Sequence, residues 1–161
     1  MGIVPAQLRT AAFGSLDSAT LYALLRLRVD VFVVEQGCAY PELDGHDLDP
    51  ATVHMWATDS GQVVAYLRLL AEPDSVRRIG RVCVAAEHRG SGLAGRLVTE
   101  ALRLSAAFPV VLNAQSHLTG WYERLGFAVS GPEFIDDGIP HVPMRLASGR
   151  HSPDPSSGVG C

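Results

Sequence analysis

The sequence IGRVCV at residues 79–84 is followed, after a short break, by RGSGLAG at residues 89–95. The β-branched first segment predicts a buried strand. After it, Leu93, Leu97, Ala101 and Leu104 recur at the spacing of one apolar face of a helix. The three glycines of the second segment therefore fall where this helix begins.

The start of a helix is a binding site for anions. Its first backbone N–H groups have no partner within the helix, and the macrodipole leaves partial positive charge there. Gly90, Gly92 and Gly95 lack a Cβ and so allow a phosphate to approach the backbone closely, while Arg89 and Arg96 add positive charge. These residues predict a phosphate cradle.

The spacing of the cradle distinguishes three classes of nucleotide site. A P-loop needs a lysine at its end, and this chain contains no lysine. Residues 90–95 also read G-x-G-x-x-G, as in dinucleotide-binding domains. However, the acidic residue expected about twenty positions later is replaced by Asn113 and Gln115. The fingerprint also lies in the middle of the chain, which leaves little room for two mononucleotide-binding halves.

Two blocks together resemble the GNAT superfamily of N-acyltransferases. Residues 89–94 fit its pyrophosphate-loop pattern Q/R-x-x-G-x-G/A, and GWYERLGF at residues 120–127 resembles its second signature, with a predicted strand at 110–114 between them. Further blocks, RVDVFVVEQ at 28–36, YPELDGHD at 40–47 and DGIPH at 137–141, resemble the ElaA-like branch. That branch usually has Cys-Pro-Tyr where this chain has Cys38-Ala39-Tyr40.

The resemblance implies a fold and an activity. The expected fold is α/β, a mixed, twisted central sheet flanked by helices, with the cofactor site where two central strands splay apart. The expected activity is N-acetyl transfer from acetyl-CoA, as co-substrate, to an amine by direct attack in a ternary complex. A non-catalytic CoA-binding module is the alternative from another class, and a nicotinamide-binding domain is a weaker one.

The resemblance also assigns roles to particular residues. Tyr122 would protonate the departing thiolate, and the backbone N–H groups of residues 82–84 would meet the pantetheine arm. Glu35 or His117 would remove a proton from the amine through water. The expected cofactor-binding residues are Val82, Cys83, Val84, Arg89, Gly90, Ser91, Gly92, Leu93, Ala94, Gly95, Asn113 and Tyr122.

Bulk properties favour a single domain. The chain has 161 residues, of which 47% are hydrophobic and 19% charged. We expect a domain at 1–146 and a disordered tail at 147–161, whose Ser, Pro and Gly cannot bury enough apolar surface. An odd count of three cysteines, with no membrane-length apolar run and no signal-peptide pattern, predicts a cytoplasmic location.

The net charge and the positions of the charged residues indicate which classes of partner suit this chain. The net charge of −4 argues against nucleic acid as a partner. The acidic segment 38–50 is expected to be an exposed loop without metal-ligand spacing around His46, and its charge, with Asp136 and Asp137, would attract a cationic amine. The arginines at 77, 78 and 81 are expected on a solvated strand edge rather than in a nucleic-acid patch, with contact to a phosphorylated cofactor near the cradle as the alternative role. The acceptor (small amine, aminoglycoside, peptide N-terminus or protein lysine) and the oligomeric state stay open.

Strands and helices are predicted along the rest of the chain from hydrophobic periodicity. One face of the first helix is expected to carry Leu21, Leu24, Leu25 and Phe32. The expected strands are 7–13, 52–59, 62–70, 79–84, 110–114, 127–134 and 141–146, and the expected helices begin near 18, 93 and 117.

Overall fold

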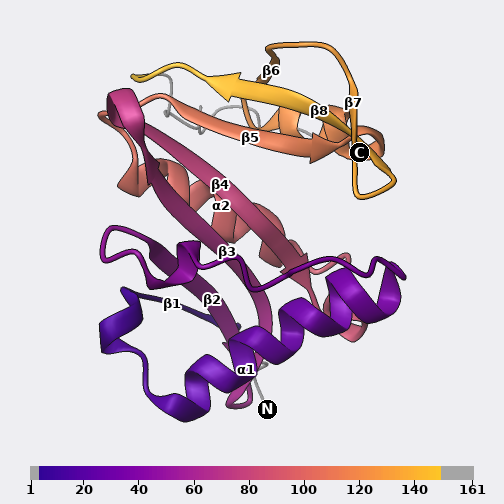
Figure 1. Ribbon diagram of the computed structural model, residues 1–161. Helices are drawn as coiled ribbons and strands as arrows, with labels where there is room; N and C mark the ends of the chain where they lie inside the picture. The colour runs from indigo at the N-terminus through magenta and orange to yellow at the C-terminus, as the bar shows by residue number, and fades with distance from the viewer. Residues whose placement is uncertain (1–3, 150–161) are drawn as a thin grey trace.

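A computed structural model describes residues 4–149 of the chain, so the predicted tail lies outside the described residues from residue 150 onward. Eight strands form one mixed sheet in the order β1-β2-β3-β4-β5-β8-β6, with β7 paired to β8 (Figure 1). The predicted α/β architecture with a mixed, twisted sheet and flanking helices is confirmed. None of the described helices has the length and apolarity that a membrane span needs.

The elements follow the predicted order with changes at their ends. The fourth strand begins earlier than expected, and the region predicted as one strand at 127–134 gives two short strands, β6 and β7, whereas the strand predicted at 141–146 forms β8 with two further residues at its start. The strands are β1 Gln7–Ala11, β2 Val53–Asp59, β3 Gln62–Glu72, β4 Val76–Val84, β5 Val110–Gln115, β6 Ala128–Val129, β7 Phe134–Asp136 and β8 Ile139–Leu146. The helices are α1 Ser18–Val29, continued by a π-helical segment η2 Asp30–Glu35, α2 Leu93–Leu104 and α3 Thr119–Arg124.

The sheet divides into two halves at the junction of β4 and β5. Strands β1 to β4 are antiparallel neighbours, and β5 pairs with β8 along its whole length. In contrast, β4 and β5 run parallel and pair at only two positions, Arg77 with Val110 and Arg78 with Val111. Beyond these positions the two strands diverge, as Figure 1 shows. The expected splay of two central strands is therefore present.

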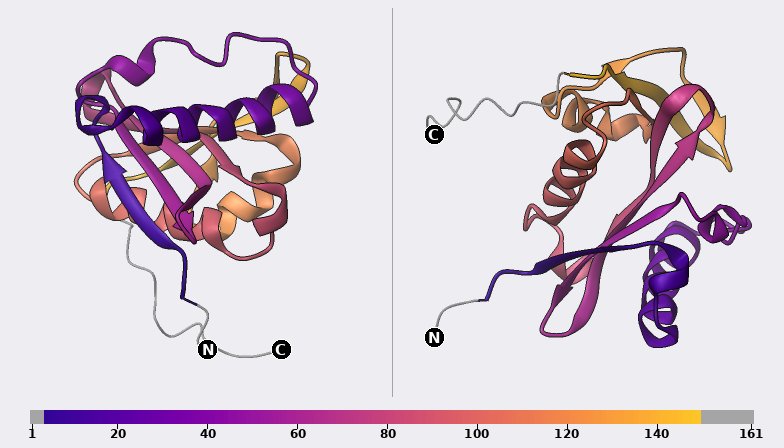
Figure 2. Two further views of the ribbon diagram at one scale, coloured as in Figure 1. Left: turned by 90° about the horizontal axis from the view of Figure 1, so that it is seen from below. Right: turned by 90° about the vertical axis from the view of Figure 1, so that its left-hand side faces the viewer.

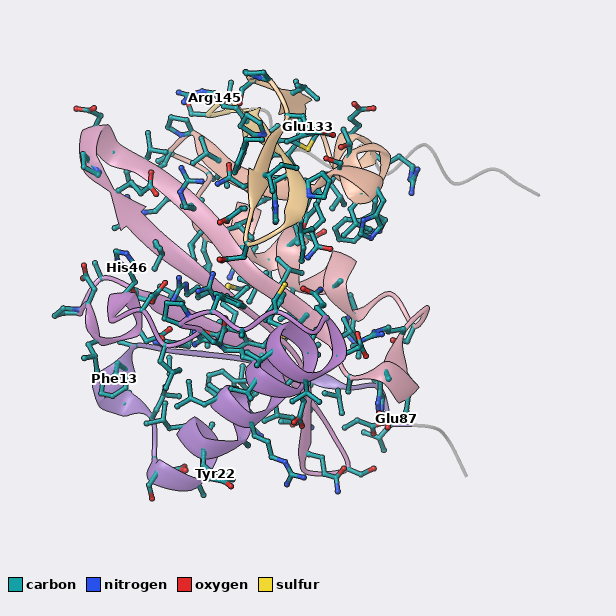
Figure 3. The ribbon with its side chains drawn as sticks, turned by 45° about the vertical axis from the view of Figure 1, so that its right-hand side comes forward. Phe13, Tyr22, His46, Glu87, Glu133 and Arg145 are labelled. Carbon is teal, nitrogen blue, oxygen red and sulfur yellow. The ribbon has the colours of Figure 1, made fainter. Side chains whose placement is uncertain are left out.

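Helices α1 and α2 lie on opposite faces of the antiparallel half (Figure 2). Alternate strand residues point to opposite faces, so each helix covers its own apolar cluster. The larger cluster joins α2 to the sheet through residues such as Leu97 and Ile79. Leu104, expected on the same face, is exposed at the last turn of α2. The smaller one joins α1 to Trp56, Tyr66 and Cys83. Tyr22 points away from the sheet on the outer side of α1 and is 70% exposed (Figure 3).

The buried side of α1 differs from the prediction because it carries a charge. The side chains buried there are Leu24, Leu27, Arg28 and, in η2, Val31, whereas Leu21 and Leu25 are half-buried. Arg28 is only 1% exposed. A buried guanidinium needs anionic partners, and periodicity cannot identify partners that lie far away in the sequence.

Those partners come from the segment at 38–50, which was wrongly expected to be a solvated acidic loop. Arg28 donates to Glu42 Oε1 at 2.8 Å and to Asp47 Oδ1 at 2.8 Å. Arg68 of β3 donates to Asp44 Oδ1 at 2.8 Å and to Asp47 Oδ1 at 3.2 Å. Glu42 and Asp47 are buried. The segment is thus bound to the sheet by a buried ion cluster.

The pKa values of the side chains in and beside this cluster follow from their contacts. Burial alone would raise the pKa of the Asp47 carboxyl, but the hydrogen bond and charge of Arg28 outweigh it and hold that pKa below its usual range. His54 Nε2 lies 3.1 Å from Asp47 O, a pure acceptor, so the ring must be protonated at Nε2 and accept at Nδ1 from Tyr66 Oη at 2.7 Å. Burial lowers the pKa of His54, which favours this neutral form.

Replacing Arg28 with alanine should strongly destabilise the protein. The change leaves two buried carboxylates without their cation, and breaking such a pair costs about 3–5 kcal/mol. The matched control is Arg26→Ala on the same helix. Arg26 is 72% exposed and pairs with Asp30 at 3.7 Å, a pair worth about 0.5 kcal/mol or less. Urea unfolding measures both; similar losses in the two variants would contradict the role of the cluster.

Stability should also fall as the pH decreases from about 7 to 5. Because the folded-state pKa of His54 lies below 6.5, the unfolded chain takes up a proton that the folded chain does not. Below about pH 4 the low-pKa carboxylates Asp44 and Asp47 add a second loss. Urea unfolding across this range checks the profile. The variant His54→Gln should lack the first stage, and an unchanged slope between pH 7 and 5 would refute the assignment.

Candidate active site

The diverging edge of β4 presents backbone N–H groups to the gap. Ala85 N donates to Val64 O of β3 at 2.8 Å, and N–H groups alternate between the two edges of a strand. The N–H groups of Val82 and Val84 therefore face β5, beyond the last β4–β5 pair. Two of the three predicted N–H groups thus point into the gap, whereas that of Cys83 faces β3.

A β-bulge changes the direction of the side chains in this part of β4. Tyr66 pairs with Cys83 and Arg68 with Gly80, so β4 contains one more residue than β3 across this interval. Arg81 has a φ of 55°, an uncommon value for a residue with a side chain. Bulges bend a strand and redirect its side chains. Here the bulge places the Arg81 guanidinium 5.6 Å from the centre of the Tyr40 ring.

The predicted cradle lies at the end of β4, at the start of α2. Gly90 and Gly92 have φ values of 77° and 81°, which favour glycine. An added Cβ at either glycine would meet no atom within 4 Å, so the loop is open. Gly92 caps α2 without a side-chain hydrogen bond, which leaves the N–H groups of Leu93 to Gly95 pointing outward. This geometry fits a phosphate group.

Arg89 connects the cradle to the end of η2. Its Nη2 donates to both carboxylate oxygens of Glu35, at 2.9 and 2.7 Å, and its Nε donates to Val84 O at 3.2 Å. Ser91 Oγ donates to His88 O. The π-helical turn at the end of η2 brings Glu35 to this position. Glu35, one of the two candidate bases, therefore forms an ion pair with Arg89, the residue expected to bind phosphate.

Tyr122 lies on α3 between two aromatic rings. Its ring makes edge-on contacts with Trp121 at 4.8 Å and Phe127 at 6.0 Å between centroids. Burial raises the pKa of the Tyr122 phenol to about 12. Within the described residues no hydrogen bond involves its hydroxyl, although the residue lines the cleft. The phenol is therefore protonated at neutral pH and free to donate to a ligand.

One cleft of about 690 Å³ is lined by all the residues expected to act in catalysis or to bind the cofactor. Arg96, which was expected to add charge to the cradle, does not line it, because its Nη2 donates to Ala6 O at 2.9 Å instead. On the cradle side it includes Val82 to Val84 and Arg89 to Gly95, and its lining also includes Asn113 and Tyr122. Glu35 and His117, the two candidate bases, lie on its walls; His117 is exposed in a short 3-10 turn before α3. The structure therefore brings the predicted set together around the gap between β4 and β5.

Two contacts cross this cleft from one half of the molecule to the other. Gln115 Nε2 at the end of β5 donates to Gln36 Oε1 at 3.4 Å, and Cys38 Sγ donates to Asp137 O at 3.3 Å. Asp137 lies in the turn between β7 and β8. The segment after η2 and the β7–β8 turn therefore meet across the cleft.

Sequence reasoning missed the part of the cleft opposite the cradle. It is lined by residues from four separate segments, among them Cys38, Tyr40, Arg68, Arg78, Arg81 and His141. The expectation that the arginines of β4 are a solvated edge was wrong: Arg78 bonds Glu72, and Arg81 Nε lies 2.9 Å from Glu42 Oε2. The clustering of three arginines within five residues was the available signal.

The described residues contain no group of three His, Cys, Asp or Glu side chains arranged to hold a metal ion. His46, the one histidine considered for such a site, projects from the surface of the 38–50 segment (Figure 3). Its backbone N–H donates to Asp44 Oδ1 at 3.1 Å. The carboxylates around it are bound by arginines instead.

The fold and the cleft define an acyltransferase of the GNAT class with a CoA-type co-substrate. Residues 31–148 match the model of the acetyltransferase (GNAT) domain. The chain belongs to this family, and its resemblance to the ElaA-like branch is confirmed. The literal dinucleotide fingerprint at 90–95 therefore does not indicate a nicotinamide site.

Individual relatives agree with the family. The chain is 50% identical to UPF0039 protein Rv2851c of Mycobacterium tuberculosis over 140 residues, 84% of this chain and 90% of the relative. A crystal structure described as an acyl-CoA N-acyltransferase from Pseudomonas aeruginosa is 42% identical with a TM-score of 0.82, covering 89% of this chain and 100% of that one. Escherichia coli ElaA is 35% identical with a TM-score of 0.83, covering 88% and 99%.

Replacing Gly92 with alanine should weaken CoA binding at least about tenfold. The added Cβ disfavours the φ of 81° by about 1 kcal/mol and intrudes where a phosphate would approach. Gly61→Ala is the matched control, since Gly61 has a φ of 80° in the β2–β3 turn, outside the cleft. Ligand-dependent thermal shifts measure both. Equal CoA affinity in the two variants, or equal stabilisation of the parent protein by NAD, would contradict the cradle.

Proposed function

We propose that this protein is an N-acetyltransferase that transfers an acetyl group from acetyl-CoA to an amine in a ternary complex. The observation that carries the proposal is the arrangement of the cleft. An anion cradle lies at one end of the β4–β5 gap, and the same cleft is lined by a buried phenol that has no hydrogen-bond partner within residues 4–149. The printed description of the Pseudomonas aeruginosa neighbour as an acyl-CoA N-acyltransferase supports it.

In the proposed reaction the free amine attacks the carbonyl carbon of the thioester. A C–N bond forms as the carbonyl π electrons move to oxygen, and the N–H groups of Val82 and Val84 are the nearest candidates to stabilise that oxyanion. The C–S bond then breaks and sulfur leaves with the bonding pair. Sulfur takes a proton from Tyr122 Oη, the amide nitrogen gives up its extra proton, and solvent restores the phenol.

The raised pKa of the Tyr122 phenol makes it a weaker proton donor. A thiol has a pKa near 8.5, so full transfer of a proton from a phenol of pKa about 12 is uphill. We therefore assign Tyr122 mainly to hydrogen-bonding the sulfur as negative charge develops, with the proton following as the bond breaks. Because this phenol stays protonated, its contribution persists throughout the pH range in which amines lose their protons.

The proposed base is reached through water. Glu35 lines the cleft, but both of its oxygens accept from Arg89, so it acts only if a phosphate at the cradle draws Arg89 away. His117 is exposed and also lines the cleft.

An amine acceptor and a cytoplasmic location complete the proposal. The location is supported by the odd number of cysteines, which suits a reducing compartment.

Replacing Tyr122 with phenylalanine should lower kcat by about tenfold to a hundredfold, because the hydroxyl that hydrogen-bonds the departing sulfur and supplies its proton is lost while the aromatic packing is retained. CoA affinity should change little, which separates turnover from binding. Tyr22→Phe, on the exposed side of α1, is the control. Thiol release from acetyl-CoA over an amine panel measures turnover.

The outcomes of this experiment are distinct. Undiminished kcat in Tyr122→Phe would remove the phenol from the mechanism. CoA binding without thiol release for any amine would favour the non-catalytic CoA-binding module instead. An alkaline loss of kcat below about pH 10 that disappears in Tyr122→Phe would contradict the raised pKa of the phenol.

A further inference from the structure

Two arginines on neighbouring strands line the cleft and carry spare N–H groups. Arg68 Nε and Arg78 Nη1 are buried from solvent and have no hydrogen-bond partner among the described residues. Arg68 is only 4% exposed, yet it lines the cleft. Buried donors without acceptors are rare in folded proteins, because each one loses its hydrogen bond to water and gains none in return. Both groups lack the same thing, a hydrogen-bond acceptor.

The register places the two guanidiniums on one face of the sheet. Arg68 lies opposite Gly80, and Arg78 lies two residues before Gly80 on the same strand. Such diagonal neighbours have Cβ atoms roughly 7–8 Å apart, a distance that long side chains can span. Gly80 also keeps the space open, because a Cβ built on it would come within 4.0 Å of Arg68 Nε. The two guanidiniums therefore extend from the same stretch of the sheet, and both line the cleft.

The remaining N–H groups of these arginines hold them in place. Arg68 Nη1 donates to Asp44 and Asp47, and Arg78 Nε and Nη2 donate to Glu72. The surrounding cations Arg28, Arg68, Arg78 and Arg81 are matched in number by the anions Glu42, Asp44, Asp47 and Glu72. The array therefore offers directed donors rather than excess positive charge. This favours a singly charged anion with two acceptor oxygens.

We propose that the acceptor is a small amine that also carries a carboxylate, and that Arg68 Nε and Arg78 Nη1 bind this carboxylate. The inference rests on the proposed function, since it describes the acceptor of that reaction. The ammonium end of such a molecule has acidic neighbours at the same cleft, because Asp136 and Asp137 line it at the β7–β8 turn. A zwitterion of the amino-acid type thus matches both kinds of group.

The test compares matched amines that differ only in the anionic group. L-amino acids are paired with their C-terminal amides, and β-alanine is paired with O-phosphoethanolamine. Thiol release from acetyl-CoA gives kcat/KM, expressed per concentration of free amine because the two members of a pair differ in amine pKa. We expect the carboxylate member to exceed its amide at least about tenfold. Amides used equally well, or a preference for the phosphate, would overturn the proposal.

The variant Arg78→Gln tests the residues. It should bring the carboxylate-to-amide ratio close to one, mainly through the KM for the carboxylate member, while CoA affinity is unchanged. Arg103→Gln is the matched control, because Arg103 is exposed and forms a comparable pair with Glu100 away from the cleft. Thermal denaturation checks that both variants fold, and Arg78→Lys replaces the first if it does not. An unchanged ratio in a folded Arg78 variant would overturn the assignment.

A binding measurement separates this proposal from the proposed function. N-acetylglycine and N-acetylglycinamide represent products with and without the carboxylate, and their thermal stabilisation of the CoA-bound protein needs no turnover. If no amine is acetylated, the proposed function fails while this comparison still applies. Stronger stabilisation by the acid, lost in Arg78→Gln, supports the carboxylate site, and equal stabilisation overturns it.

Discussion

The divergence of β4 from β5 is the constraint on which the rest of the structure depends. Two parallel strands in the middle of a sheet normally satisfy each other's backbone groups, but here they do so at only two positions. The unpaired edges, including the N–H groups of Val82 and Val84, require polar partners. A ligand with amide and carbonyl groups along its length can supply them, and the glycine cradle at the end of β4 fixes where the anionic end of that ligand belongs.

The buried ion cluster shapes the other end of the cleft. Its carboxylates from the 38–50 segment hold Arg28 under α1, but they also bind Arg68 and Arg81, which line the cleft. A buried ion pair is weak evidence for net stability, since a well-packed apolar replacement can be as stable. The cluster instead gives fixed orientations to guanidiniums that would otherwise be mobile. Stability and the geometry of the acceptor side are therefore linked through the same side chains.

The sequence could predict the parts of the site whose residues are adjacent in the chain. The cradle was predictable because the strand, the glycines and the helix are adjacent in the chain, and the second signature around Tyr122 was an equally compact block. The ion cluster was not, because Arg28 meets Glu42 and Asp47 across 14 and 19 residues and Arg68 comes from another strand. Charge counting therefore described residues 38–50 as a solvated acidic loop. The bulge at Arg81 likewise depends on the register with β3, which no local pattern encodes.

The neighbour of Tyr122 gives the molecule a spectroscopic property. The sequence contains two tryptophans. Trp56 is buried beneath α1 in the smaller apolar cluster, whereas Trp121 lines the cleft, with its indole 3.9 Å from where a Cβ on Gly95 would lie. Occupancy of the cleft alters the surroundings of one indole and leaves the other in place. The intrinsic fluorescence of the unlabelled protein is thus an optical reporter of ligand binding, with Trp56 as its internal reference.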